Sequence, residues 1–236
     1  MKFTLSKHLS HSTVLTFVTK EDLKLLPKIQ DFEAEKKEIA IRYDSRKAIV
    51  YCGLGVRDDV GPAVIRRAAA SGLRQALSKK RPDVSVVAPA ASGGVAEPWR
   101  PALEGALLGA YSFVKYKKDK GTALSALELC GETVPQREAG RVKTICDCVN
   151  YSRDLVNENA HIANPGFLAA QARAIAKAGK MSCKVLDEKD LVKRGLRLLA
   201  AVGQGSPFPP RLAVIEYRGN TSSKERTAIV GKPPFN

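Results

Sequence analysis

An α/β fold is indicated by residues 48–89, which read AIVYCGLGVRDDVGPAVIRRAAASGLRQALSKKRPDVSVVAP. The opening AIVYC is a short run of β-branched and aromatic residues, as in a buried strand. After the Gly53-Leu-Gly55 turn, Pro62 begins a stretch in which apolar residues recur at helical spacing. A further apolar run of strand length, VSVVAP, begins at Val84. A strand, a helix and a strand in this order predict helices packed on a sheet.

The same alternation continues on both sides of this segment. A helix with one apolar face is predicted from Pro98 through Phe113, and the lysine-rich residues 115–120 are expected to end it. Residues 131–140 are rich in Gly, Pro and charge, which indicates a break after the first unit. Further runs of strand type occupy residues 13–18 (TVLTFV), 39–43 (IAIRY) and 124–130 (LSALELC).

The break is followed by a helix that we interpret as a connector. Its apolar face is outlined by Val142, Ile145, Cys146, Val149 and Leu155.

A second α/β unit comes after the connector. Asn164 is a predicted N-cap with Pro165 at the first helical position, and Gly179 is expected to end that helix. Asp187 is expected to cap a short helix that runs to Gly195. Strands are predicted at residues 183–187 (CKVLD), 211–217 (RLAVIEY) and 227–232 (TAIVGK).

Composition excludes several classes of protein. The chain has 236 residues, of which 44% are hydrophobic and 27% charged, the mix of a globular protein rather than a disordered one. Its apolar runs are too short to predict a membrane-spanning helix, and polar residues interrupt the first eighteen residues, which argues against a signal peptide. The five cysteines are scattered, so we expect a reduced, cytoplasmic chain.

Basic charge is the one departure from average composition. The formal net charge is +15, and the excess of Lys and Arg is divided evenly between the two halves of the chain. A basic surface attracts acidic partners such as DNA, RNA or an anionic membrane. The even distribution does not favour a dedicated nucleic-acid-binding segment, so this function is an alternative hypothesis.

The spacing of reactive residues does not by itself predict an active site. Gly53 and Gly55 follow a strand, but the third glycine of a dinucleotide-binding fingerprint is absent. The neighbouring Asp58 and Asp59 are expected to be turn residues.

Metal sites are not indicated by the histidines and cysteines either. His8 and His11 have the spacing to share one face of a helix, yet nothing near them completes a metal shell, and we expect them at a fraying terminus. Cys146 and Cys148 point in different directions on a helix, so they cannot jointly hold a metal ion. A catalytic triad would have to rest on one unplaced histidine.

Three segments in the second half of the chain form an ordered set of motifs: RDLVNENAHIANPGFLA (153–169), LLAAVGQGSPFPPRLAVIEYRG (198–219) and TAIVGK (227–232). In this order and spacing they resemble the opening of the catalytic domain of the cytosol (leucyl) aminopeptidase family. An earlier segment, EGALLGAYSFVKYK at residues 104–117, is similar to a helix in the N-terminal domain of that family.

The resemblance implies a particular organisation and chemistry. It implies a macrodomain-like α/β domain over residues 1–136, a linker helix over 137–160 and the start of an incomplete α/β metallopeptidase domain over 161–236. Members of the family use two divalent metal ions, Zn or Mn, to remove N-terminal residues from peptides, and they assemble as hexamers. Peptides and further copies of the chain are therefore the expected partners, DNA is a possible partner under the alternative hypothesis, and no membrane is expected.

Lys232 is the one metal ligand that the resemblance carries over. The family continues from this position through a Thr-Phe-Asp-x-Gly-Gly stretch, a second lysine and an Asn-Thr-Asp-Ala-Glu-Gly-Arg motif, whereas here Pro-Pro-Phe-Asn follows Lys232. A single lysine cannot hold a divalent cation at neutral pH, because protons compete for the amine and other ligands are missing. We therefore expect no catalytic residues, no bound metal and no peptide hydrolysis from these residues alone. The alternatives are a non-catalytic nucleic-acid-binding or assembly module, and an α/β scaffold without activity.

Overall fold

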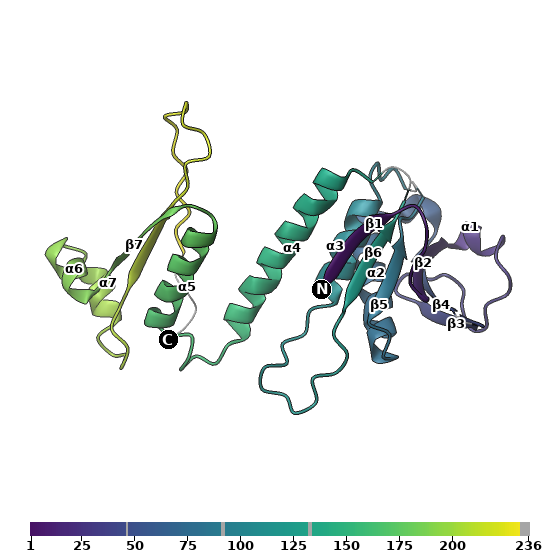
Figure 1. Ribbon diagram of the computed structural model, residues 1–236, viewed down its shortest axis with the longest axis horizontal. Coiled ribbons are helices and arrows are strands. Elements are labelled where there is room, and N and C mark those ends of the chain that lie inside the picture. The colour runs from purple at the N-terminus through teal and green to yellow at the C-terminus, as the bar shows by residue number, and fades with distance from the viewer. Residues whose placement is uncertain (46, 91–92, 132–133, 232–236) are drawn as a thin grey trace. The chain divides into compact units, whose positions relative to one another are not determined.

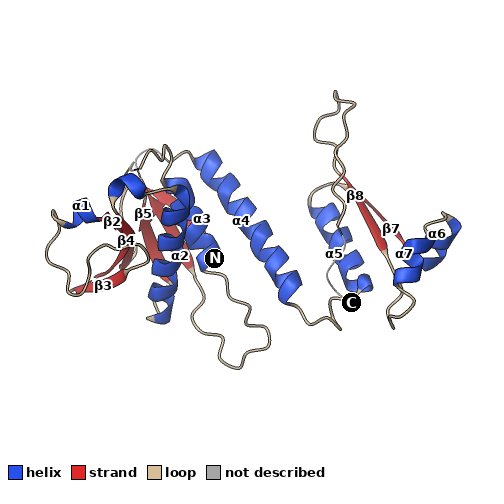
Figure 2. Cartoon of the chain, turned by 180° about the vertical axis from the view of Figure 1, so that it is seen from behind, coloured by secondary structure: helices blue, strands red, loops and turns tan. Residues whose placement is uncertain are grey.

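The computed structural model describes residues 1–231, apart from residues 46, 91–92 and 132–133. The chain divides into two compact units, Met1–Asp154 (unit 1) and Leu155–Asn236 (unit 2). Figure 1 labels most of the elements of both units. Helices and strands alternate in each unit, as Figure 2 shows, which confirms the predicted α/β fold class.

Unit 1 is built on a six-stranded sheet with the strand order β1-β6-β5-β2-β4-β3. All neighbouring strands run parallel except β3 and β4, which form an antiparallel pair. The strands are β1 (Lys2–Ser6), β2 (Thr13–Thr19), β3 (Ile39–Asp44), β4 (Lys47–Gly55), β5 (Asp83–Val87) and β6 (Ala126–Cys130).

Helices cover this sheet and close its core. Leu15 of β2, Leu73 of α2 and Leu103 of α3 belong to one buried cluster, and each is fully shielded from solvent. The start of α4 joins the same cluster through Val142 and Cys146. The helices of unit 1 are α1 (Lys20–Leu23), α2 (Pro62–Ser78), α3 (Trp99–Gly109) and α4 (Gln136–Asn157), with a 3-10 turn at Arg57–Asp59.

The first strand was missed by the sequence analysis. Residues 2–6 form β1, which pairs in parallel with β6, so the prediction of a fraying terminus was wrong. His8 and His11 lie in the loop after β1 rather than on a helix. This strand forms because it pairs with a strand more than a hundred residues away in the chain. The local pattern of apolar residues does not contain the information needed to predict such a pairing.

Two predicted helix boundaries in unit 1 were wrong. The helix from Pro98 ends at Gly109, so Phe113 and the lysine-rich residues 115–120 lie in a loop. Lysines at close helical spacing repel one another, which disfavours continuing the helix. The predicted break at 131–140 is also too long, because α4 begins at Gln136.

The predicted turn at Gly53-Leu-Gly55 is instead the end of strand β4. The backbone N–H of Gly53 donates to the carbonyl of Glu38 at 2.9 Å, and that of Gly55 donates to the carbonyl of Ala34 at 2.8 Å. A Cβ atom at position 53 would lie 2.1 Å from the carbonyl oxygen of Glu35. These glycines therefore admit a neighbouring backbone rather than a phosphate.

Unit 2 contains two antiparallel strands and three helices among the residues described. The N-cap at Asn164 and the end of α5 at Gly179 are confirmed. Asp187 caps α6 as predicted, and helix α7 was not predicted. The elements are α5 (Pro165–Ala178), β7 (Ser182–Leu186), α6 (Glu188–Lys193), α7 (Arg197–Val202) and β8 (Leu212–Glu216).

The last predicted strand does not form within the described part of the chain. Residues 227–231 have no strand pairing, and the Ile229 and Val230 side chains are 97% and 93% exposed. A β-branched run becomes a strand only where another strand pairs with it. Among the described residues, none of the helices combines the length and apolar character needed to cross a membrane.

Candidate functional site

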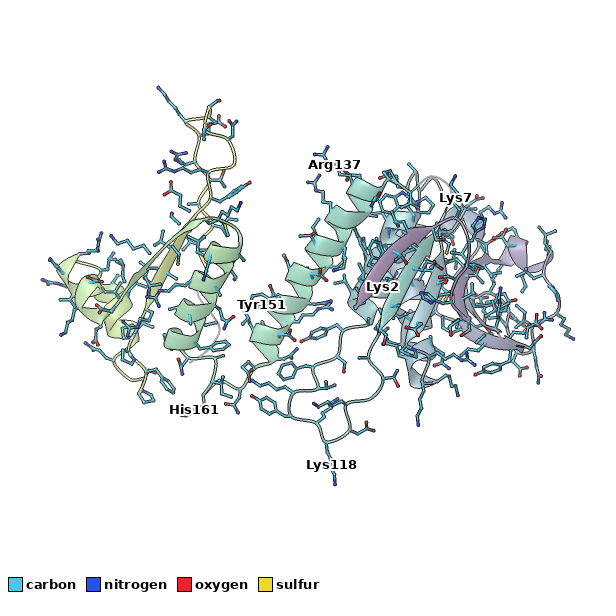
Figure 3. The ribbon with its side chains drawn as sticks, viewed as in Figure 1. Lys2, Lys7, Lys118, Arg137, Tyr151 and His161 are labelled. Atoms are coloured by element: carbon cyan, nitrogen blue, oxygen red, sulfur yellow. The ribbon has the colours of Figure 1, made fainter. Side chains whose placement is uncertain are left out.

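The first of the three family-like segments, residues 153–169, forms the end of α4, a tight loop and the start of α5. Asn164 organises this loop: its Oδ1 accepts the backbone N–H of Phe167 at 3.0 Å, and its Nδ2 donates to the carbonyl of His161 at 3.2 Å. The backbone N–H of His161 donates to Oδ1 of Asn159 at 2.9 Å. These bonds fix the backbone that carries the His161 side chain, which is labelled in Figure 3.

The second segment, residues 198–219, contacts the first. The ring of Phe208 packs edge to face on the ring of His161, with 5.2 Å between centroids. The turn before β8 is tight, since a Cβ at Gly203 would lie 2.9 Å from the ring of Pro210. Two segments that are separated by about thirty residues along the chain therefore meet at the His161 loop.

The predicted metal ligand, Lys232, lies outside the described residues, so its position is a prediction only. No three His, Cys, Asp or Glu side chains gather into a metal-binding group anywhere in the described part of the chain. A pair of metal ions needs several convergent oxygen and nitrogen donors. The described donors do not fit the two-metal centre that the family uses.

The carboxylates that sequence analysis assigned to caps and turns have those roles. Asp187 accepts the backbone N–H of Asp190 at 3.0 Å, and a second contact of 3.8 Å joins its carboxylate to Arg211. Asp59 lies in the 3-10 turn and forms an ion pair of 3.2 Å with Lys36. Neither carboxylate is positioned as a general acid or base.

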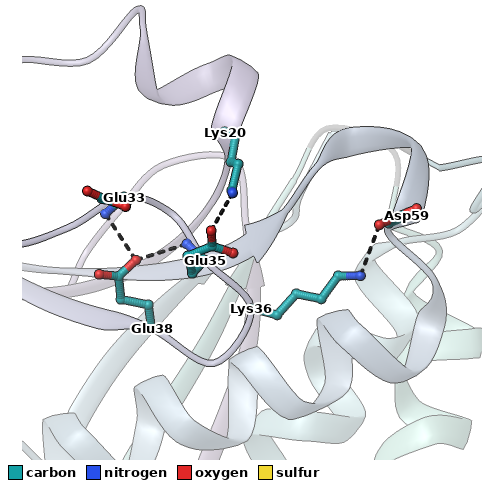
Figure 4. A network of polar contacts seen from close by, with 6 residues as sticks. All are labelled: Lys20, Glu33, Glu35, Lys36, Glu38 and Asp59. Carbon is teal, nitrogen blue, oxygen red and sulfur yellow. Dashed lines mark hydrogen bonds and ion pairs between the residues drawn. The ribbon is translucent and has the colours of Figure 1, made fainter.

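Residues 31–38 form an irregular segment that packs on the end of β4. Figure 4 shows how polar contacts hold it: Lys20 pairs with Glu35, and Lys36 pairs with Asp59. One carboxylate oxygen of Glu38 accepts two backbone N–H groups of the same segment, at 3.0 and 2.9 Å. The segment is therefore fixed from both sides, and its last turn places Lys37 on the surface of unit 1.

Glu128 is the one buried carboxylate among the described residues, and sequence analysis did not single it out. Its side chain is 3% exposed in the middle of β6. The backbone N–H of Ser10 donates to it at 2.9 Å, and the hydroxyls of Ser10 and Ser85 donate at 2.7 and 2.6 Å. The sequence does contain a sign of this group, because a glutamate inside the apolar run LSALELC indicates a buried carboxylate that needs hydrogen-bond partners.

These hydrogen bonds determine the charge state of Glu128. Burial alone would raise its pKa, but the bonds from Ser10, Ser85 and the Cys130 thiol outweigh burial and lower the pKa to about 2. The carboxylate is therefore ionised at neutral pH and ties the loop after β1 to the sheet. With both carboxylate oxygens engaged and almost no exposure to solvent, it is a structural group.

The buried cysteines are poor nucleophiles. Burial, with a contribution from Glu128, raises the pKa of Cys130 to about 12, and burial, with Glu104 and Asp147, raises that of Cys146 to about 11. Burial also raises the pKa of Cys52. The reactive thiolate is therefore strongly disfavoured at neutral pH in all three.

Comparison with known protein families explains the order of the segments. The N-terminal domain model of the cytosol aminopeptidase family matches residues 5–120, and the catalytic domain model of the same family matches residues 150–233. The chain belongs to the cytosol aminopeptidase family. The recognition made from the motifs is thus confirmed, and it extends over both units.

Similar cytosol aminopeptidases are about twice as long as this chain. It is 32% identical to a probable cytosol aminopeptidase of Aquifex aeolicus, over 91% of this chain and 44% of the relative. It is 30% identical to a probable cytosol aminopeptidase of Chlamydia trachomatis, over 91% of this chain and 46% of the relative. The chain thus spans less than half the length of these relatives.

Solved structures agree with the fold. The bottromycin maturation enzyme BotP in complex with Mn is similar with a TM-score of 0.74 and 23% identity, over 88% of this chain and 45% of that one. A mutant of tomato leucine aminopeptidase is similar with a TM-score of 0.79 and 19% identity, over 96% of this chain and 52% of that one. At these identities the likeness concerns the fold alone.

Proposed function

We propose that these residues form the N-terminal domain and the opening part of the catalytic domain of a leucyl aminopeptidase-like subunit, and that they do not hydrolyse peptides by themselves. The observation that carries the proposal is the ordered match of both family domains along one chain. The proposed division is an N-terminal domain at 1–136, a linker helix at 137–160 and the catalytic-domain segment at 161–236. The gap between the two matched ranges and the division after Asp154 support it.

The proposed inactivity follows from the number of metal ligands. Hydrolysis in this family depends on two divalent ions, and the manganese in the BotP complex supports that chemistry for the family. Lys232 is the family ligand that the sequence carries, and the described residues add no cluster of donors. A complete site therefore needs ligands from elsewhere. We propose that the hexameric assembly implied by the resemblance, and the cytoplasmic location suggested by the names of the relatives, apply to the complete subunit.

The test is release of leucine from leucine p-nitroanilide by the purified 236-residue protein, with and without Mn²⁺ or Zn²⁺. We expect no metal-dependent release, and a complete cytosol aminopeptidase assayed in parallel should be active. The matched control is Lys232→Ala. Metal-dependent release by the unaltered protein that disappears in Lys232→Ala would contradict the proposal, whereas equal release by both proteins would identify a contaminating peptidase.

A second candidate function is a non-catalytic nucleic-acid-binding or assembly module, and the net charge of +15 favours it. Binding that depends on phosphate contacts weakens steeply as salt is raised. A gel-retardation series with duplex DNA over increasing salt tests this candidate. Failure to retard DNA even at low salt would remove it.

A further inference from the structure

A shallow pocket of about 390 Å³ opens on the surface of unit 1 where α2 and α3 pack together. Basic side chains dominate its wall, and no acidic residue is among the described residues that line it. This volume lies within the range of small-molecule sites in proteins. The basic residues of the pocket are Lys37, Arg66, Arg67, Arg74 and Arg153.

Helical spacing brings three of these cations together. Arg66, Arg67 and Arg74 lie on one face of α2, because residues separated by seven or eight positions are two turns apart on the same side of a helix. Ala70 and Ser71 lie between them on this face. Their small side chains leave room above the helix surface, and the arginines surround that room.

Close packing of the two helices gives the pocket a rigid floor. A Cβ added at Gly105 of α3 would lie 2.1 Å from the carbonyl oxygen of Arg66, and one at Gly109 would lie 2.6 Å from the Cα of Ala70. Only glycine allows the helix backbones to approach this closely. The α2 arginines are thus attached to a surface that cannot shift easily.

Arg153 offsets the partial negative charge at the C-terminal end of α3, which would otherwise repel an anion. The carbonyl groups at the end of α3 carry partial negative charge. The Arg153 guanidinium donates to the carbonyl of Leu108 at 3.1 Å and to Oδ1 of Asn150 at 3.2 Å, and it lies over the ring of Tyr111 at 5.4 Å. The guanidinium is held in place and offsets the negative end of α3.

Most of the positive charge in the pocket is unbalanced. Arg66 is paired with one carboxylate oxygen of Glu104, at 2.8 and 2.6 Å. Within the described part of the chain, no carboxylate lies within 4.0 Å of the charged groups of the other four basic residues. Arg153 offsets the end of α3, so the charges of Lys37, Arg67 and Arg74 remain without a described carboxylate partner.

We propose that this pocket binds a small molecule with two linked phosphate groups. Guanidinium groups form paired hydrogen bonds with phosphate oxygens, and a pyrophosphate group carries about three negative charges near neutral pH, about the number that the pocket leaves unpaired. A shallow site of this size accommodates a compact anion, whereas duplex DNA needs a broad surface. The pocket is formed by unit 1 alone, so the site does not depend on the peptidase assignment.

The experiment is isothermal titration calorimetry of the 236-residue protein with inorganic pyrophosphate at low ionic strength. The test variant is R67Q/R74Q, which removes two exposed side chains of the pocket. The matched control is R137Q/R141Q, which removes two exposed charges from α4 outside the pocket; Figure 3 labels Arg137. We expect R67Q/R74Q to weaken binding at least about tenfold and the control to change it less than about twofold. R67K/R74K should lie between them, because lysine keeps the charge and loses the paired geometry.

Thermal unfolding of each variant shows whether it is folded, and the single variants R67Q and R74Q replace the double variant if it is not. Absence of pyrophosphate binding by the folded, unaltered protein would overturn the proposal. Equal weakening in the control would also overturn it, because binding would then depend on overall charge. A short duplex DNA is the competitor. If it displaces pyrophosphate, and if R67Q/R74Q binds this DNA more weakly than the unaltered protein does, the arginines form a nucleic-acid-binding surface and the proposal is wrong.

Discussion

Unit 1 and unit 2 use the same kinds of strand residue, yet only unit 1 buries them. Val50 in β4 is fully buried, whereas Val214 and Ile215 in β8 are 49% and 40% exposed. Both large buried clusters found among the described residues lie in unit 1. Among the described residues, unit 2 carries more than half of the exposed large apolar side chains, although it is the smaller unit.

This difference in burial indicates whether each unit covers its own apolar strand residues or leaves them for another part of a domain to cover. A run of consecutive apolar residues such as LAVI in β8 is typical of a strand covered on both faces. Unit 1 supplies its own cover through its helices. Unit 2 exposes a two-stranded sheet, and such sheets are marginal without further strands or helices. This agrees with the proposal that unit 2 is the opening part of a larger catalytic domain.

The largest expected effect on stability is from a substitution that creates a cavity in the core of unit 1. Leu103→Ala should lower the free energy of unfolding by about 2–5 kcal/mol, because Leu103 is fully buried in the main cluster. Trp99 is the only tryptophan and is buried in the same cluster, so its fluorescence in a urea titration reports on unit 1. Leu25→Ala, at an 85% exposed position, is the control and should change little. If Leu103→Ala lowers the free energy of unfolding by less than about 1 kcal/mol, unit 1 does not have the well-packed core that distinguishes it from unit 2.

The next effect is the pH dependence of unit 1. The pKa of Glu128 is lowered from 4.5 to about 2, so the unfolded state binds more protons between these values. The stability that its ionised form contributes, up to about 3 kcal/mol, is present above pH 4.5 and is lost as the pH falls toward 2. Urea titrations followed by Trp99 fluorescence between pH 7 and pH 3 measure this loss. Glu128→Gln should be less stable at pH 7 and should have a flatter profile; an unchanged acid slope would refute this role.

A smaller effect is expected at the start of α5 in unit 2. Asn164→Ala removes the side-chain acceptor for the N–H of Phe167 and should cost about 1 kcal/mol of local stability. Hydrogen exchange of the first-turn amides of α5 measures this change. Asn164→Asp keeps an acceptor oxygen and should preserve protection. If both variants exchange like the unaltered protein, the cap does not stabilise this loop.

The smallest effect is expected on the exposed face of unit 2. Leu198 is 85% exposed, so Leu198→Ala should change the unfolding free energy by less than about 0.5 kcal/mol in the isolated protein. Thermal unfolding followed by circular dichroism measures it. A loss comparable to that of Leu103→Ala would show that this face is already covered in solution.

Sequence patterns predicted best where local chemistry is sufficient. The Asn164 and Asp187 caps and the helix that begins at Pro62 were located correctly, because the residues that start a helix lie next to it. The break and the connector helix also predicted two units, and the family motifs added the aminopeptidase assignment, which spacing alone did not identify.

Features that depend on distant partners were missed. Strand β1 exists because β6 pairs with it, and the Gly53 turn became a strand end because residues 31–38 pack on it. The pocket on unit 1 joins residues from the Lys37 segment, α2, α3 and α4, so no single stretch of sequence shows it. Ile229 and Val230 have strand composition, but no strand pairs with them in the described chain.

The central claim is that unit 1 completes its own core and unit 2 does not. Hydrogen–deuterium exchange of the 236-residue protein, read separately for peptides of β2 and β4 and peptides of β7 and β8, tests it most directly. We predict that β2 and β4 exchange only on global unfolding, and that β7 and β8 exchange at least about a hundredfold faster. Equal protection of the two sheets would contradict the claim.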